Sequence, residues 1–286
     1  MGTGPNVRQR RVARRLRQWR QDKGLTLGEV ASRLRWSTNK LSRYERAEKP
    51  LAGPAEVIAL AAVLGISEQE RDQVVATCVD SLEGGAGWWT AYGPETVPAH
   101  FTDYLETEAE ASVVCTVEVI LIPGLLQTGD YAEALFTANA SADERTLVTE
   151  RRRLRQQRQA RLDEASPLEL HAIIHEAALT LPVGGTAVMA EQLDVLTERA
   201  AQPNVTVQMI PAKVGAYPWM GNAYHVLSFD DADSGAVFVD NLSRGIYLED
   251  DAEVEAYTLN FERLAAIALD PETSAQRITE IRGGLT

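Results

Sequence analysis

Apolar residues recur at helical spacing along the first fifty residues of the chain. Val12, Leu16 and Trp19 lie on one face of a predicted helix over residues 8–23. Two shorter amphipathic segments follow within residues 23–50 and are joined by a tight turn. The pattern predicts three short helices that share one small core.

The second of these helices is predicted to begin at Thr26, because a threonine oxygen at this position can cap free backbone N–H groups. Its inward face is predicted from positions i, i+3, i+4 and i+7. The residues at those positions are Leu27, Val30, Ala31 and Leu34.

The third helix is predicted to begin at Ser37 and to bury Leu41 and Tyr44. Its other side chains then face outward, and they are Thr38, Asn39, Lys40 and Arg43. Asn and Arg can make bidentate hydrogen bonds to base edges, whereas Ser, Thr and Lys can hold phosphates. We interpret the segment as a DNA-binding helix-turn-helix. The alternative is an ordinary helical hairpin whose exposed charges are solvated.

Two further helices complete the predicted N-terminal domain. One spans residues 55–64 and ends at Gly65, and the other begins with a capping box formed by Ser67 and Glu70. We therefore expect an all-α, five-helix domain over residues 1–82.

Charge is distributed unevenly along the chain. Residues 1–50 contain 14 Lys and Arg against 4 Asp and Glu, a net charge of +10, whereas the whole chain carries −13, which leaves −23 for the rest. A basic N-terminal part attached to an acidic remainder is typical of a DNA-binding module. The predicted DNA contacts are Arg15, Thr26, Arg35, Ser37, Thr38, Asn39, Lys40 and Arg43.

The helix-turn-helix segment also resembles a known class. The motifs are L-R-x-x-R-x-x-x-G-L-T from Leu16, V-A-x-x-L from Val30 and S-x-x-x-L-S-R-Y-E from Ser37. They are similar to the Cro and phage-repressor class, also called the xenobiotic-response-element (XRE) class. The resemblance implies a structural ion pair between Arg20, late in the first helix, and Glu45, at the end of the recognition helix.

The segment departs from that class at two positions. The Gln that usually opens the second helix is Leu27 here, and the Gly usual in the turn is Arg35. Arg35 must therefore take an uncommon positive φ or use another turn geometry.

Length and composition favour an intracellular protein of two domains. The chain has 286 residues, of which 45% are hydrophobic, but no run of apolar residues is long enough for a membrane span. No apolar segment follows the Arg-rich start, so a secretory signal is not expected. Cys78 and Cys115 are too few for a disulfide framework or a zinc site. We expect a cytoplasmic, nucleoid-associated protein.

Residues 83–98 are predicted to form a joint rich in glycine and aromatic residues. A plain linker does not need Trp88, Trp89 and Tyr92, so we expect this segment to pack against a neighbouring domain. Whether it sets the orientation of the DNA-binding domain or only anchors a loop stays open.

Residues 99–286 are predicted to form an α+β domain with a mixed sheet of four to six strands and flanking helices. The expected strands are residues 113–122, 168–174, 205–210, 224–229 and 236–242, and the last two are joined by a polar hairpin loop at residues 230–235. The expected helices are residues 101–111, 131–138, 143–165, 187–201 and 252–269. The order strand, helix, strand between residues 168 and 210 predicts local parallel pairing.

The predicted helix over residues 143–165 carries a run of arginines. They are Arg151, Arg152, Arg153, Arg155, Arg158 and Arg161. A second nucleic-acid surface is one interpretation, but the surrounding sequence is strongly acidic. Internal ion pairs or a surface for a partner protein fit better, because guanidinium groups pair well with carboxylates.

No catalytic or cofactor signature is visible in the sequence. His171 and His175 would share a face of a helix, but the alternating pattern favours a strand there and the motif H-E-x-x-H is missing. Cys115 lies in a predicted buried strand without an obvious base. We expect no catalytic residue, no metal site and no cofactor, and we do not expect an enzyme.

The C-terminal part resembles a second family. Its signatures are IPGLLQTGDYA from Ile122, ERRRLRQQ from Glu150, HEAALTLPVGG from His175, EQLDVL from Glu191 and NVTVQMIP from Asn204. They are similar to the large C-terminal domain of unknown function in WhiJ-like actinobacterial regulators. The resemblance implies transcriptional control, often beside a small partner protein encoded nearby, and some members are antitoxin-like.

Three functional hypotheses follow. The first is a regulator that binds an inverted repeat in double-stranded DNA as a homodimer, with a recognition helix over residues 37–45 and a C-terminal domain that dimerises or senses a ligand or small protein partner. The second is an antitoxin-like protein that mainly binds a small partner and autoregulates its operon. The third is a ligand sensor or cryptic enzyme with a pocket near residues 123–128 and 217–224, where the alternative is an ordinary loop.

Overall fold

The computed structural model describes residues 7–83, 87–141, 143–229, 235–240 and 245–285. The chain divides into two compact units, one up to Trp88 and the other from Trp89 onward. The division lies within the joint predicted at residues 83–98, and residues 84–86 of that joint lie outside the described residues. Each unit is described by itself.

The N-terminal unit consists of five helices. They are α1 (Val7–Asp22), α2 (Leu27–Leu34), α3 (Thr38–Glu45), α4 (Pro54–Leu64) and α5 (Glu68–Glu83). Leu16, Trp19, Val30, Leu41 and Leu60 are almost fully buried in its core. The predicted five-helix, all-α fold is confirmed, and the apolar spacing placed the inward side of α1, α2 and α3 correctly.

The helix ends follow the sequence closely. The Thr26 side chain accepts a hydrogen bond from the Glu29 backbone N–H, and Glu29 accepts from the Thr26 backbone N–H, so α2 begins with a complete capping box. The Ser37 hydroxyl accepts from the Lys40 backbone N–H at the start of α3. Gly65 ends α4 in the left-handed conformation with φ of 63°.

The second unit contains a six-stranded sheet with the strand order β3-β2-β1-β4-β5-β6. The strands are β1 (Val113–Glu118), β2 (Glu169–His175), β3 (Val205–Ile210), β4 (Tyr224–Ser228), β5 (Ala236–Val239) and β6 (Ile246–Leu248). Strands β1, β2 and β3 pair in parallel, and β4, β5 and β6 add antiparallel neighbours. The predicted α+β fold with a mixed sheet is confirmed, as is the parallel pairing of β2 with β3.

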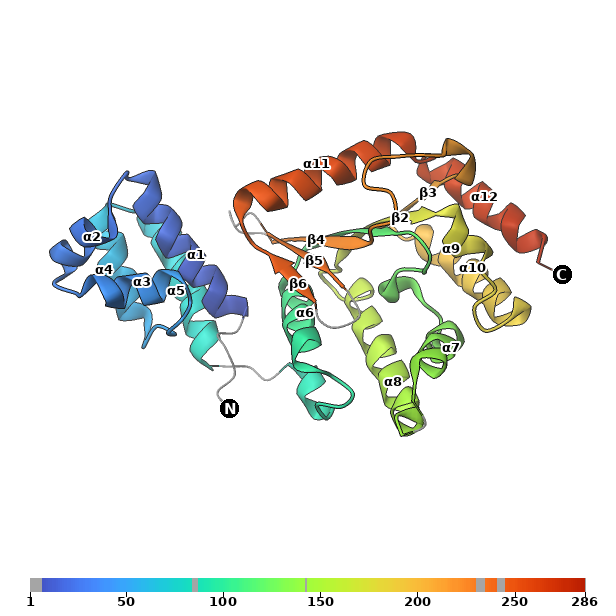
Figure 1. Ribbon diagram of the computed structural model, residues 1–286, viewed down its shortest axis with the longest axis horizontal. Coiled ribbons are helices and arrows are strands. Elements are labelled where there is room, and N and C mark those ends of the chain that lie inside the picture. Colours follow the sequence, from blue (N-terminus) through green and yellow to red (C-terminus); the bar gives the residue numbers. More distant parts are fainter. Residues whose placement is uncertain (1–6, 84–86, 142, 230–234, 241–244, 286) are drawn as a thin grey trace. The chain divides into compact units, whose positions relative to one another are not determined.

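Helices cover both faces of this sheet (Figure 1). They are α6 (Ala99–Glu110), α7 (Gly129–Asn139), α8 (Val148–Gln159), α9 (Glu176–Thr180), α10 (Thr186–Ala200), α11 (Asp251–Ile267) and α12 (Pro271–Gly283). Helix α11 lies along one face, where Val254, Phe261 and Leu264 pack on Ile173 and Val226.

The opposite face carries the larger core. Side chains of α6, α7, α10 and α12 pack there on alternate residues of the strands, including Leu170 and Met209. The predicted inward residues of α10, Met189, Leu193 and Leu196, are all fully buried.

Three predicted elements differ from the structure. The strand predicted over residues 113–122 ends at Glu118, and Ile120 beyond it is 58% exposed. The helix predicted over residues 143–165 is broken into the 3-10 turn η3 (Arg145–Leu147), α8 and the 3-10 turn η4 (Ala160–Leu162). Ile267, expected on the apolar face of the last predicted helix, is exposed at the end of α11. Sequence reasoning also missed β6, α9 and α12.

The segment that follows the unit boundary packs on the C-terminal unit. Trp89 and Val97 are buried, the Tyr92 hydroxyl donates to Gln157 Oε1 at 3.1 Å, and the Thr96 hydroxyl donates to Glu150 Oε2 at 2.6 Å. The expected packing of this aromatic segment against a neighbouring domain is therefore present for Trp89 and Tyr92.

None of the helices in the described parts of the chain has the length and apolar character needed to cross a lipid bilayer.

Candidate nucleic-acid interface

Helix α3 presents one polar face. Thr38, Asn39 and Arg43 are exposed, Lys40 is half-buried, and Leu41 and Tyr44 on the opposite face are buried. The helix therefore has the division of faces that the sequence predicted. Ser37 is also exposed, but its hydroxyl is engaged in capping the helix. The outward side chains form a short row of hydrogen-bond donors and acceptors with the chemistry needed to contact base edges and phosphates.

A buried ion pair fixes the C-terminal end of this helix. Arg20 of α1 donates from Nε to Glu45 Oε1 and from Nη2 to Glu45 Oε2, both at 2.7 Å. Its Nη1 also donates to the Leu25 carbonyl oxygen at 2.9 Å. The hydrogen bonds that Arg20 donates to Glu45 raise the pKa of Arg20. One guanidinium thus joins α1, the loop before α2 and the last residue of α3.

Lys40 is held against two aromatic rings. Its Nζ lies 4.1 Å from the centre of the Trp36 ring and 5.4 Å from the centre of the Tyr44 ring, and 4.0 Å from Glu56 Oε1. Cation–π contacts of this kind restrain a lysine that would otherwise move freely. Sequence reasoning counted Lys40 among the DNA contacts but did not find its stacking, because the Trp36 ring comes from the turn and not from the helix pattern.

Arg35 ends α2 in the left-handed conformation, with φ of 55° and ψ of 35°. Of the two possibilities that the sequence left open, the positive φ is therefore the observed one. A side chain other than glycine is strained in this conformation. Arg35 and Thr26, which lies at the other end of α2, are both exposed.

Replacing Arg35 with glycine should stabilise the N-terminal unit, because glycine adopts a positive φ without a steric penalty. We expect the free energy of unfolding to rise by about 0.5–1 kcal/mol. Arg33→Gly is the matched control, since Arg33 lies within α2, where glycine should destabilise by about 1 kcal/mol. Calorimetry of the whole chain measures the stability of both variants. If Arg35→Gly lowers the free energy of unfolding, the backbone at Arg35 is not strained.

Arg15 lies apart from the exposed row on α3. Its Nη2 forms an ion pair with Glu70 Oε1 at 2.6 Å, and its Nη1 donates to Gln18 Oε1 at 3.0 Å. Glu70 Oε1 also accepts from the Trp19 indole N–H at 2.7 Å. The predicted capping box is present in part, because the Ser67 hydroxyl accepts a hydrogen bond from the Glu70 backbone N–H at 3.3 Å. The Glu70 carboxylate instead joins α1 to α5. Arg15 stays a prediction as a DNA contact, with its charge already paired.

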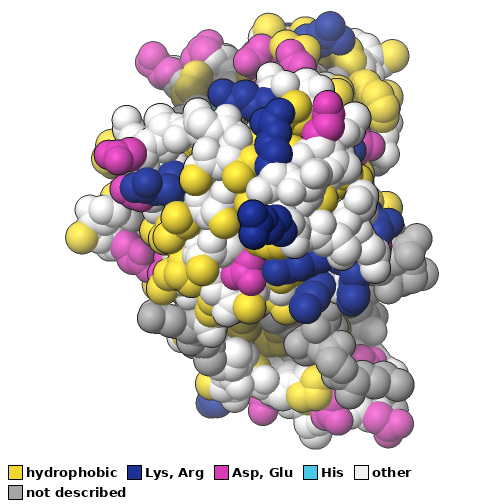
Figure 2. All heavy atoms as spheres, turned by 90° about the vertical axis from the view of Figure 1, so that its left-hand side faces the viewer, with side chains coloured by type: hydrophobic (Ala, Val, Ile, Leu, Met, Phe, Trp, Pro, Cys, Tyr) yellow, Lys and Arg dark blue, Asp and Glu magenta, His cyan; other side chains and the backbone are white. Residues whose placement is uncertain are grey.

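Basic side chains gather on one surface of this unit. Figure 2 looks at the side of the molecule on which α2 and α4 lie, and Lys and Arg side chains form a group near the middle of that face, between apolar and uncharged polar ones. The exposed basic residues of the helix-turn-helix segment are Lys23, Arg33, Arg35, Arg43, Arg46 and Lys49. Such a cluster attracts the phosphate backbone of DNA, and the attraction weakens as salt is raised.

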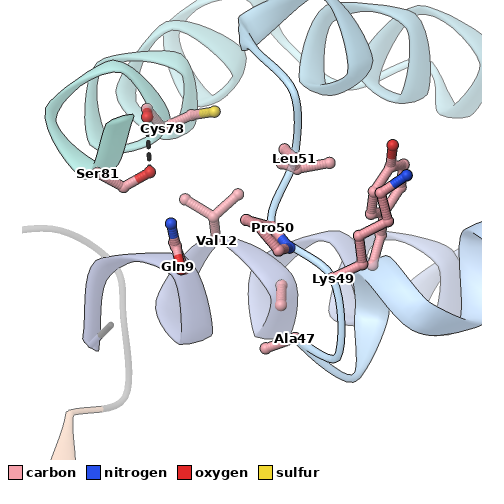
Figure 3. Close-up of a pocket in the computed structure, with 10 residues that line it drawn as sticks. Gln9, Val12, Ala47, Lys49, Pro50, Leu51, Cys78 and Ser81 are labelled. Carbon is pink, nitrogen blue, oxygen red and sulfur yellow. Dashed lines mark hydrogen bonds between the residues drawn. The ribbon is translucent and has the colours of Figure 1, made fainter. Parts of the chain in front are cut away.

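The same unit has a small hollow that borders the basic cluster at Lys49 (Figure 3). It lies between α1, the segment after α3 and α5, and Val12, Ala47, Leu51 and Cys78 line it (Figure 3). The Ser81 hydroxyl donates to the Cys78 carbonyl oxygen at 2.7 Å beside it. None of the predicted DNA contacts is among its lining residues, so the hollow is not part of the candidate interface.

The arginine run of the C-terminal unit forms internal ion pairs. Arg151 pairs with Glu144, Arg152 with Asp130 and Glu133, and Arg161 with Glu164. Arg158 is buried and bidentate on Glu108, and Arg155 has its pKa lowered to about 10, mainly by burial. The prediction of internal ion pairs is confirmed for Arg151, Arg152, Arg158 and Arg161. A second nucleic-acid surface on α8 is not supported, because most of its positive charge is neutralised or buried.

The predicted strand through His171 is confirmed. His171 Nε2 lies 2.7 Å from Gln208 Oε1 on the neighbouring strand, and burial lowers the pKa of His171. Among the residues that the structure describes, no three His, Cys, Asp or Glu side chains come together as a possible metal site. Cys115 is half-buried, and burial raises the pKa of its thiol to about 11.

Comparisons with protein families matched both units. A model described as a helix-turn-helix domain matches residues 11–74, and a model described as a domain of unknown function, DUF5753, matches residues 101–280. A search of curated proteins and a search of solved structures gave no match. The two matches confirm the predicted combination of a Cro/phage-repressor-type helix-turn-helix with a large C-terminal domain of unknown function.

Proposed function

This chain belongs to the DUF5753 family and carries the helix-turn-helix of a DNA-binding regulator, and we propose that it controls transcription by reading a specific DNA sequence with α3. The exposed polar face of α3 is the observation that supports this role most directly. The helix is short, its inward side chains are buried, and its last residue is anchored by Arg20. A rigid helix of this kind can present a fixed set of side chains to the major groove.

Each predicted contact has a proposed role. Asn39 and Arg43 read base edges, because their side chains can form bidentate hydrogen bonds with adenine and guanine. Ser37, Thr38 and Lys40 support them at the same groove, and Thr26, Arg35 and Arg15 contact phosphates. The stacking of Lys40 on Trp36 keeps its ammonium group near one place, which favours a defined phosphate contact.

The proposed regulator acts in the cytoplasm, at the nucleoid, as a homodimer on an inverted repeat. Two α3 helices would then enter successive major grooves about 34 Å apart. The C-terminal unit would provide dimerisation and would sense a ligand or a small protein partner. We propose no catalytic role and no cofactor for the chain.

The role of α3 is tested with the variant that carries Thr38→Ala and Asn39→Ala. Genome-wide capture first gives the preferred DNA fragment, and competition binding then compares it with a scrambled fragment. The variant should lose roughly tenfold or more of the preference, because one bidentate base contact contributes about 1–3 kcal/mol of discrimination. Its dependence on salt should stay nearly unchanged, since no charge is removed.

Gln73→Ala is the matched control, because Gln73 is an exposed polar residue on α5 outside the helix-turn-helix segment. It should bind as the parent chain does. A double variant that retains the preference would refute the assignment of α3, and capture of no preferred fragment by the parent chain would refute sequence-specific binding by the free protein.

An antitoxin-like role is the second candidate. The excess of negative charge on the C-terminal part favours a basic or polar protein partner over DNA at that unit. Co-purification of an untagged protein encoded nearby would support this role, and capture restricted to the chain's own promoter would support autoregulation.

A further inference from the structure

A pocket with three aromatic residues lies on the α11 side of the C-terminal sheet. It is lined by Trp219, Asn222, Tyr224, Ala256, Tyr257 and Asn260 and has a volume of about 320 Å³, counting the part open to solvent. Tyr224 belongs to β4, and Tyr257 and Asn260 to α11, so the sheet and the helix form its fixed walls. Trp219 comes from the loop that precedes β4. This loop was one of two places where the sequence suggested either a pocket or an ordinary loop.

The rings of Tyr224 and Trp219 both lie close to the Tyr257 ring. The Tyr224 ring lies edge-on to it with centroids 5.0 Å apart, and the Trp219 ring lies 6.2 Å away at an interplanar angle of 41°. The faces of such rings carry negative electrostatic potential, which attracts cations and in particular quaternary ammonium groups. The ring edges carry positive potential, so the proposed attraction comes from the ring faces that border the pocket.

A buried acceptor also lines this pocket. Asn260 is 5% exposed, and its Nδ2 donates to the Tyr224 hydroxyl oxygen at 2.8 Å. Its Oδ1 is buried and has no hydrogen-bond partner. Buried polar atoms are nearly always paired, so this acceptor is available to a donor group of a bound molecule. A ligand with an O–H or N–H group would supply it.

The backbone at Trp219 is strained. Its φ is 56°, a conformation that is rare for a bulky residue, and the side chain is 65% exposed, so burial offers little compensation. Strain of this kind tends to persist where the side chain has a function. The conformation keeps the indole beside Tyr257.

The neighbouring charge is negative. The segment from Glu249 to Ile267, which includes all of α11, contains six acidic side chains and one basic side chain, Arg263. A cation is therefore favoured over an anion at this pocket, and the remaining acidic groups of the C-terminal part add to the same field.

We propose that the pocket formed by Trp219, Tyr224, Tyr257 and Asn260 binds a small organic cation, an ammonium compound that also carries a hydrogen-bond donor. The cation would lie among the aromatic rings, and its donor group would pair with Asn260 Oδ1. The site lies wholly in the C-terminal unit and does not depend on the proposed DNA contacts.

Calorimetric titration of the whole chain with choline tests this site without DNA. Choline has a quaternary ammonium group and a hydroxyl donor, and 3,3-dimethylbutan-1-ol has the same shape and hydroxyl without the charge. Choline should bind at one saturable site roughly tenfold more tightly than the neutral alcohol. Equal affinities would overturn the assignment to a cation, and the absence of saturable choline binding at tens of millimolar would overturn the site.

Two variants locate the binding. Trp219→Gly should weaken choline binding roughly tenfold while the melting temperature stays equal or rises, because glycine accepts the positive φ. Tyr257→Leu should weaken it similarly. Met220→Ala is the control, since Met220 is exposed beside Trp219 but does not line the pocket. Unchanged affinity in either pocket variant, or equal loss in the control, would overturn the proposed location.

Discussion

Replacing Glu108 with alanine should destabilise the C-terminal unit by about 3–5 kcal/mol, because the change leaves Arg158 buried without its counter-charge. Arg158 donates from Nε to Glu108 Oε1 at 2.8 Å and from Nη2 to Oε2 at 2.6 Å, and the two side chains are only 5% and 3% exposed. The guanidinium also lies 5.3 Å from the Phe101 ring and 5.1 Å from the Tyr104 ring. Water cannot readily replace the lost carboxylate in these surroundings.

Asp194→Ala is the matched control for this prediction. Arg282 holds Asp194 with Nε and Nη2 in the same bidentate way, but these side chains are 45% and 49% exposed. Water can solvate Arg282 once its partner is removed, so we expect a loss below about 1 kcal/mol. If calorimetry shows that Glu108→Ala and Asp194→Ala are equally destabilising, then burial does not determine how much an ion pair contributes to the stability of this unit.

The pair also predicts the response to acid. Burial alone would raise the pKa of Glu108, but the Arg158 guanidinium outweighs it, and the pKa lies below its ordinary value of 4.5. The stabilisation from the ionised pair is therefore present above about pH 4.5 and is lost as the pH falls through the lower native pKa. The double variant Glu108→Met with Arg158→Met removes both charges and should unfold with a weaker dependence on pH in this range.

The sequence correctly predicted the structural features that depend on local residue spacing and on helix capping. The inward faces of α1, α2 and α3 follow from repeats of three and four residues, and the caps at Thr26 and Ser37 lie within three residues of the groups they satisfy. Patterns of this range require no knowledge of the tertiary fold. The same holds for β3, whose predicted bounds agree with the structure.

Contacts that do not follow the regular spacing of a helix or strand set the features that the sequence could not supply. The apolar residues after Glu118 look like more strand, but Ile122 is held by the Tyr131 hydroxyl and by Gln127, so the chain turns away from the sheet there. The arginine run predicted carboxylate partners in general, yet Glu108 lies 50 residues before Arg158.

The same limit applies to the two places where the sequence suggested a pocket. Residues 123–125 line a small hollow whose other walls come from α6, α8, β1, β2 and β4. The Arg155 guanidinium occupies the space that a side chain at Gly124 would need. Near Trp219 a pocket exists because α11 brings Tyr257 and Asn260 to β4. In both places elements distant in the chain supply part of the walls, so local composition could not define either pocket.

Replacing Glu45 with alanine should lower the free energy of unfolding of the N-terminal unit more than any substitution on its DNA-facing surface. Arg20, whose side chain is 13% exposed, would lose its hydrogen bonds to Glu45, whose side chain is 3% exposed. Breaking a buried pair of this kind destabilises by about 3–5 kcal/mol, which lowers the melting temperature of a small domain by roughly 15 °C or more. Calorimetry of the whole chain measures this change.

The position of Glu45 makes the pair more than a local contact. A carboxylate at the C-terminal end of a helix is unfavourable with respect to the helix dipole, so Glu45 would weaken α3 without Arg20 beside it. The pair thus joins α3 to α1 at the end opposite the Ser37 cap. Without the Arg20–Glu45 pair, the C-terminal end of α3 should become mobile. DNA affinity should then fall even at temperatures at which the variant is folded.

Glu48→Ala separates this effect from a simple change of charge. Glu48 pairs with Arg46 just after α3, but these side chains are 45% and 55% exposed, so the loss should stay below about 1 kcal/mol. Both variants remove one negative charge from the same unit and should strengthen its general attraction to phosphate equally. If Glu45→Ala binds DNA more weakly and Glu48→Ala does not, positioning of α3 by Arg20 is the cause. If both bind alike well below their melting temperatures, the pair stabilises the fold without positioning the recognition helix.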